Sequence, residues 1–199
     1  MIVKSKNVRA SQVSRKKASS SLGSHFKYIQ YRERDPLLES KEDRRVFNKE
    51  YDHVDRRAAH DQVMQGAPAG DIYYHRMILS PAADEPVDDL RHWTRQIMAD
   101  LEERRGQDLE CYAAQHRNTD DPHVHVVVRG TGTNRETGRE EPVHLTREDF
   151  KAMRESGREH SEYEHYHLVQ EKLRELDERD TVPQEILPQE REYVPDHER

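Results

Sequence analysis

Residues 121–130 read DPHVHVVVRG, an apolar stretch that predicts a β-strand with two histidines at alternate positions. Successive side chains of a strand point to opposite faces, so His123, His125 and Val127 share one face. The other three valines share the opposite face, which we expect to pack on the core. Two imidazoles on one rigid strand point at one place. The stretch is therefore a partial metal site. The strand itself holds the two nitrogens in place, so no loop has to become ordered for them to bind.

The segment before this strand offers two candidates for the third ligand that a metal ion needs. AAQHRNTDDP (113–122) contains His116 and Asp120 on the incoming turn. A bare His-x-His is more often a pair of surface residues on a half-exposed strand. An upstream His and Asp at a strand–turn–strand junction favour a metal site instead. We expect His116 or Asp120 to complete the site, and the sequence leaves this choice open.

A second His-x-His, at positions 165–167, serves as a comparison. It lies in SEYEHYHLVQEKLREL (161–176), whose pattern predicts a helix. Residues i and i+2 of a helix differ by about 200° around the axis, so their side chains cannot converge on one ion. We interpret His165 and His167 as ordinary surface residues of a helix.

The rest of the chain predicts an α+β fold. Helices are expected from Ser20–Ser21 to about Arg34, in the polar segment before residue 66, from Val87 to Gly106, and from Thr146 to about Leu176. Strands are expected at 71–80, 109–116, 123–130 and 141–145. The order of the strands predicts a central antiparallel sheet with helices packed on it. We expect a basic arm or strand at 1–20, a catalytic domain at 20–178 and a polar, disordered tail at 179–199.

The composition limits the class of protein. Charged residues make up 37% of the chain and hydrophobic residues 32%, which predicts a modest core with polar extensions. No stretch approaches the roughly 20 apolar residues of a membrane span, and the N-terminus lacks the apolar run of a signal peptide. The only cysteine, Cys111, excludes an internal disulfide and a zinc finger. We expect a cytoplasmic protein with no membrane insertion.

The net charge of −7 is unevenly distributed. Residues 1–35 carry nine Lys/Arg against two Asp/Glu, whereas residues 151–199 carry eight against fourteen. The overall acidity counts against a protein that coats nucleic acid in bulk. A basic head can still bind phosphates, because charge acts locally.

HRNTDDPHVHVVVRG (116–130) resembles the third motif of conjugative relaxases, which are mobilisation nucleases of the HUH endonuclease superfamily. The resemblance is greatest to the MOB-P type, which includes the T-DNA border endonuclease. Two weaker motifs agree in order. GSHFKYIQYRE (23–33) offers Tyr28, followed by Arg32, where this group has a nucleophilic tyrosine on an N-terminal helix, and YYHRMILSP (73–81) offers Ser80 at the end of an apolar strand. The resemblance covers about residues 20–150 and implies an HUH-endonuclease-like fold.

The resemblance implies a site- and strand-specific enzyme that nicks and rejoins DNA at a transfer origin, on single-stranded or locally melted substrate. Tyr28 would attack a phosphate to form a 5′-phosphotyrosyl bond, and His123 and His125, with His116, would hold Mn²⁺ or Mg²⁺. Asp120 would complete the metal shell or orient an imidazole. Residues that would contact DNA are Lys16, Lys17, Lys27, Arg32 and Ser80.

The same resemblance implies partners and leaves the extent of the protein open. Accessory mobilisation proteins and a coupling protein would act with the enzyme. The chain is either a compact mobilisation relaxase or the catalytic part of a longer one.

Between the two neighbouring tyrosines, the helical pattern favours Tyr28 as the nucleophile, because Tyr31 lies about opposite the apolar stripe.

Three alternatives remain. A rolling-circle replication initiator or single-tyrosine transposase of the same superfamily would place its nucleophile after the histidines, at Tyr163 or Tyr166. A histidine-triad nucleotide hydrolase would need a third histidine at position 127, where this chain has Val127. A non-catalytic DNA-binding relative would keep the fold for origin recognition or regulation, in line with the acidic balance and short length.

Overall fold

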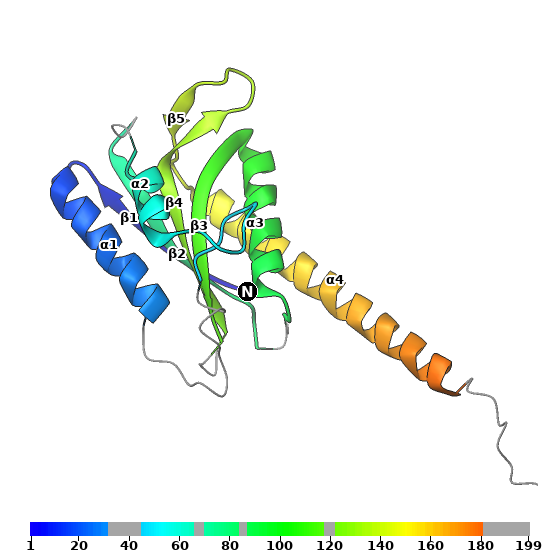
Figure 1. The fold of residues 1–199 in the computed structure, drawn as a ribbon. Coiled ribbons are helices and arrows are strands. Elements are labelled where there is room, and N and C mark those ends of the chain that lie inside the picture. Colours follow the sequence, from blue (N-terminus) through cyan, green and yellow to red (C-terminus); the bar gives the residue numbers. More distant parts are fainter. Residues whose placement is uncertain (32–44, 66–69, 84–86, 118–121, 181–199) are drawn as a thin grey trace, which may run out of the picture. The chain divides into compact units, whose positions relative to one another are not determined.

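The computed structural model describes residues 1–31, 45–65, 70–83, 87–117 and 122–180. Its elements, shown in Figure 1, follow in the order β1 (Ile2–Arg9), α1 (Arg15–Tyr31), α2 (Arg56–Val63), β2 (Ile72–Ser80), α3 (Leu90–Arg105), β3 (Gln107–His116), β4 (His123–Asn134), β5 (Glu140–Pro142) and α4 (Arg147–Asp180).

The strands form one antiparallel sheet in the order β1-β2-β4-β3, with β5 paired to β4. The strand β4, which carries the histidine pair, is central, because β2 pairs along one edge and β3 along the other. The predicted α+β fold, an antiparallel sheet with helices packed on it, is confirmed, and it is consistent with an HUH-endonuclease-like architecture.

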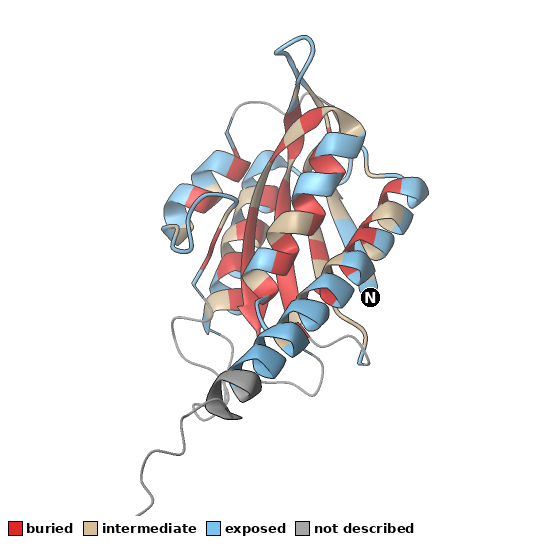
Figure 2. Cartoon of the chain, turned by 90° about the vertical axis from the view of Figure 1, so that its right-hand side faces the viewer, coloured by how far each residue is buried: buried red, intermediate tan, exposed pale blue. Residues whose placement is uncertain are grey.

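Helices cover both faces of the sheet (Figure 1), and each face has its own core. Val124, Val126 and Val128 pack on the side of α3 and of Met153 in α4. Val127 is equally buried, but it packs on the other side, with side chains of α1 and α2. The expectation of a single core face on this strand is therefore wrong. Figure 2 shows the buried residues concentrated on the strands and on the inner sides of the helices.

The helix α1 begins at Arg15, earlier than the expected start at Ser20–Ser21. Ser14 accounts for the difference, because its hydroxyl accepts from the Lys17 amide at 3.4 Å and its carbonyl accepts from the Ala18 amide at 2.9 Å. The first part of the basic head forms β1, and Lys16 and Lys17 lie on the first turn of α1 rather than in an arm. The expected end of this helix, near Arg34, falls outside the described residues.

The chain divides into two compact units, Met1–His165 and Tyr166–Arg199. Within the first unit, the indole Nε1 of Trp93 in α3 donates to the carbonyl of Gly157 in α4 at 2.8 Å. His165 and His167 both lie in α4, which confirms the helix predicted for the second His-x-His. Among the described residues, no helix is both long enough and apolar enough to cross a membrane. The helix α4 runs to Asp180, past its expected end near Leu176 and into the first two residues of the tail expected at 179–199, and the rest of that tail falls outside the described residues.

A glycine in β4 sets how closely β2 approaches. A Cβ atom added at Gly130 would overlap the carbonyl oxygen of Ile72 and lie 2.9 Å from the carbonyl carbon of Tyr73. We expect Gly130→Ala to lower the free energy of unfolding by about 1–3 kcal/mol, the usual range for an overpacked core, as measured by urea denaturation.

The control is Gly23→Ala in α1. There the nearest atom to an added Cβ, in the His60 ring, is 3.9 Å away, and alanine is the better helix former. This change should raise stability by about 0.5–1 kcal/mol. Wild-type stability of Gly130→Ala would show that the two strands are not packed this closely.

Candidate metal centre beside a helical tyrosine

The three histidines named from the sequence converge on one point. His116, the last residue of β3, lies directly opposite His123 in the antiparallel register, and His125 follows on the same face of β4. The ring centroids are 5.2 Å apart for His116–His123, 4.7 Å for His116–His125 and 5.0 Å for His123–His125. One ligand nitrogen from each ring lies within 4.8 Å of the others. We call these three residues the histidine triad.

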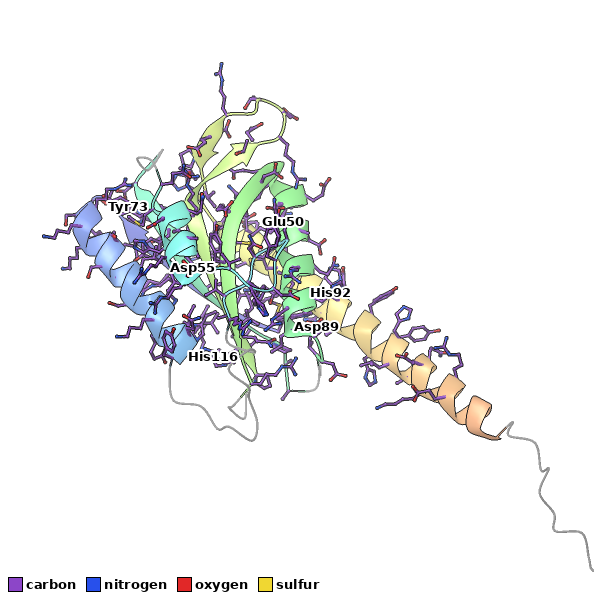
Figure 3. All side chains as sticks on the ribbon, viewed as in Figure 1. Glu50, Asp55, Tyr73, Asp89, His92 and His116 are labelled. Atoms are coloured by element: carbon purple, nitrogen blue, oxygen red, sulfur yellow. The ribbon has the colours of Figure 1, made fainter. Side chains whose placement is uncertain are left out.

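A hydrogen bond to α1 determines which nitrogen His116 can offer. Its Nε2 atom lies 2.6 Å from the backbone oxygen of Ile29. A carbonyl oxygen only accepts, so Nε2 carries the proton and, in the neutral ring, Nδ1 presents its lone pair. The side chain is fully buried, and Figure 3 shows His116 beside the C-terminal end of α1. A ligand held in one tautomer by a carbonyl is the usual arrangement at metal-binding histidines.

The donor set fits a divalent transition ion. Imidazole nitrogens suit ions of the transition series, whereas Mg²⁺ prefers oxygen ligands. Three ligands from one side of an ion leave further coordination positions for water or a phosphate oxygen. Asp120, the candidate oxygen ligand, lies outside the described residues. The three imidazoles of the triad offer nitrogens that lie close enough together to hold an ion.

Tyr28 lies at the rim of the triad. Its ring is perpendicular to that of His125 with the centroids 6.3 Å apart, and 47% of the residue is exposed. The buried stripe of α1 holds this position, because Phe26 and Ile29 pack into the core on either side of Tyr28 in the sequence. Tyr31 has different neighbours, with the Arg56 guanidinium 5.4 Å from its ring centroid. Of the two candidate tyrosines, the structure brings Tyr28 to the histidines.

Two further residues of the site were not singled out from the sequence. His25 precedes Tyr28 by one helical turn, and its ring centroid is 5.8 Å from that of His125. Burial, with smaller contributions from the charges of Arg76 and His116, lowers the pKa of His25 to about 4, so its ring is neutral at pH 7. Arg76 lies opposite Val127 in the sheet and so shares the face of the triad.

Each of these two residues has a signal in the sequence. His25 is three positions from Tyr28, the spacing of neighbours on one side of a helix. Arg76 is a charged residue in the middle of a mostly apolar strand, and its spacing of two from Ile78 puts both on one face.

The residues that we expected to contact DNA lie in different parts of the structure. The Ser80 hydroxyl donates to the carbonyl of Pro122 at 2.9 Å and thereby holds the segment that enters β4. Lys27 is exposed next to Tyr28, whereas Lys16 and Lys17 are exposed about 17 Å from Tyr28 along the helix axis. Arg32, like Asp120, falls outside the described residues.

The triad geometry predicts the effect of ligand removal. His116→Ala, His123→Ala and His125→Ala should each weaken Mn²⁺ binding by more than roughly 100-fold. Loss of a residue that only hydrogen-bonds to a metal ligand costs roughly 10- to 100-fold in affinity, and loss of the ligand itself should cost more. Isothermal titration calorimetry measures the affinity, and His167→Ala in the helical His-x-His serves as the matched control. Wild-type affinity in all three triad variants would exclude this site.

Comparison with known families identifies a relaxase nuclease domain. The family model described as the nuclease domain of MobA/VirD2-like relaxases matches residues 28–165. The matched range begins at Tyr28 and includes the whole histidine triad. No curated protein and no solved structure matches the chain.

Proposed function

This chain belongs to the family of MobA/VirD2-like relaxases, and we propose from that premise that it nicks one DNA strand at a defined site and rejoins it through a 5′-phosphotyrosyl intermediate. The family supports DNA nicking of the relaxase type. The observation that carries the finer proposal is the position of Tyr28, a half-exposed phenol at the rim of the histidine triad. Tyr28 is thus both adjacent to the candidate metal centre and exposed, whereas His116 and His125 are buried beside it.

The residues of the site have separate roles in this reaction. The Tyr28 oxygen attacks phosphorus and forms a new P–O bond, while the bond from phosphorus to the 3′ oxygen breaks. The phenol loses its proton and the departing 3′ oxygen gains one. Because one phosphate ester replaces another, the strand can be rejoined by the reverse reaction. The ordinary pKa of tyrosine is about 10, so attack at neutral pH needs nearby positive charge.

Two features supply that charge. The triad would hold a divalent ion, which polarises a non-bridging phosphate oxygen and offsets the charge that builds on it. The Arg76 guanidinium, on the same sheet face, is close enough to lower the pKa of His25 and adds to the positive potential. We propose Mn²⁺ as the better fit to imidazole ligands, with Mg²⁺ as the alternative if Asp120 contributes an oxygen.

The biological setting is proposed from the family. The substrate is single-stranded or locally melted DNA at the transfer origin of a plasmid or mobile element. Accessory mobilisation proteins would expose this DNA, and a coupling protein would receive the covalent complex. Such a reaction takes place where the plasmid is, in the cytoplasm.

The position of α4 favours Tyr28 over the nucleophile of a replication initiator. Tyr163 lies in α4, and α4 packs through Met153 and Gly157 on the α3 side of the sheet. The triad lies on the opposite side, under α1. A phosphate bound at the triad would therefore meet Tyr28 and not Tyr163.

We expect Tyr28→Phe to form no covalent DNA adduct while it still binds single strands and Mn²⁺, because the change removes one exposed oxygen and little volume. The substrate is a labelled oligonucleotide that carries the origin sequence. The adduct is detected as a slow band on a denaturing gel that protease abolishes. Tyr163→Phe, the matched control, should form the adduct at the wild-type rate.

Three results would contradict the proposal in different ways. An adduct that persists in Tyr28→Phe and vanishes in Tyr163→Phe or Tyr166→Phe would indicate a replication-initiator or transposase mechanism. Cleavage without any adduct would exclude a tyrosine nucleophile. Failure of the wild-type protein with Mn²⁺ to nick supercoiled origin DNA would indicate a non-catalytic DNA-binding relative.

A further inference from the structure

The helix α1 has an exposed face that is not part of the triad site. Gly23, Lys27 and Tyr31 are four residues apart and share one face of the helix. This face borders α2, which is joined to α1 at the His60 ring, whose Nε2 atom donates to the backbone oxygen of Ser19 at 3.1 Å and lies 3.1 Å from the Ser19 hydroxyl. Below this border the two helices share the apolar core that holds Leu22 and Val63, and the exposed residues along the border are polar or charged.

Two adjoining cavities lie along this border, each of about 300 Å³. Gly23, Lys27 and His60 line the first cavity, and Tyr31, Arg45 and His53 line the second. Arg56 and Arg57, on the first turn of α2, line both. The two cavities are therefore neighbours on either side of these arginines, and we call them together the α1–α2 groove. Figure 3 shows Asp55, at the N-terminal end of α2, on the side of the sheet where α1 lies.

The charge of the groove points to an anionic ligand. Its lining holds four cationic side chains, and α1 contains no acidic residue, in a chain whose net charge is −7. Arg56 and Arg57 stand at a helix N-terminus, where positive charge is unfavourable, so the stability of α2 does not account for them. Of the two carboxylates in the lining, Asp55 caps α2 and accepts from the amides of Arg57 at 2.8 Å and Ala58 at 3.0 Å.

Tyr31 narrows the class of anion. The residue is 65% exposed, and the Arg56 guanidinium lies 5.4 Å from the centroid of its ring. Exposed aromatic rings among cations are how proteins bind single-stranded nucleic acid, with bases stacked on the rings and phosphates on the cations. Tyr31 is also three residues from Tyr28, a spacing that makes them neighbours on the helix surface, so the groove begins next to the proposed nucleophile.

We propose that the α1–α2 groove binds the single-stranded DNA that flanks the scissile phosphate, with one base stacked on Tyr31 and backbone phosphates on Lys27, Arg56 and Arg57. The inference rests on the proposed function, because it places the cleaved bond at Tyr28. It assigns the second tyrosine of the KYIQY segment (27–31) to substrate binding, and the first to the chemistry.

Binding is measured by fluorescence anisotropy with labelled single-stranded oligonucleotides and Mn²⁺, in a Tyr28→Phe background that cannot react. Tyr31→Ala should weaken binding by roughly 5- to 150-fold, the range for loss of one stacked base. Tyr31→Phe keeps the ring and should bind like the parent. Lys27→Ala and Arg57→Ala should each lower the slope of log affinity against log salt by about 0.7, the value for one single-strand phosphate contact. The matched control is Lys151→Ala, an exposed lysine of α4.

Two results would overturn the proposal that the groove binds single-stranded DNA. One is parental affinity for DNA in Tyr31→Ala. The other comes from the same titrations with polyglutamate as a second probe. If every groove variant weakens polyglutamate binding as much as DNA binding, the groove is a site for acidic polypeptides or for anions in general. Adduct formation by the wild-type protein is scored separately. Its absence would refute the proposed function, while the anisotropy series would still decide whether the groove binds single strands.

Discussion

The site depends on one hydrogen bond, between the His116 ring and the carbonyl of Ile29. Ile29 lies close to the C-terminal end of α1 as described, so this bond ties that part of the helix to the His116 ring. It fixes the tautomer that leaves Nδ1 for a metal ion. It also places Tyr28, the residue before Ile29, at the rim of the triad. The same contact therefore bears on both the position of the proposed nucleophile and the nitrogen that His116 offers as a proposed metal ligand.

The two sides of the sheet differ in what they carry. The side covered by α3 carries a large apolar core around Trp93 and the valines of β4. The side covered by α1 and α2 has a smaller core, and its margin carries the triad, Arg76 and the groove. A central strand buried on both faces gives its histidines a rigid base, which a metal site needs for a defined geometry. The cations of the α1–α2 groove lie on this side too, and local positive charge of this kind can attract phosphates to a protein that is acidic overall.

Strand alternation and helical periodicity were enough to predict the fold class, the shared face of His123 and His125, and the choice of Tyr28 over Tyr31. The pairing of His116 with His123 could not be derived, because the register between two strands does not follow from the local pattern of either one. The start of α1 was missed because Ser14 is one of several serines that could cap a helix. The burial of Val127 was missed because alternation shows which residues share a face, but not whether a second layer of helices covers it.

The most direct test of this account is anomalous diffraction from crystals of the chain grown with Mn²⁺. The account predicts one strong peak bound by Nδ1 of His116 and by one nitrogen each of His123 and His125, with Nε2 of His116 still bonded to the Ile29 carbonyl and the Tyr28 hydroxyl facing the ion. A peak bound by Nε2 of His116 with the Ile29 contact broken, or a peak away from the triad, would contradict it.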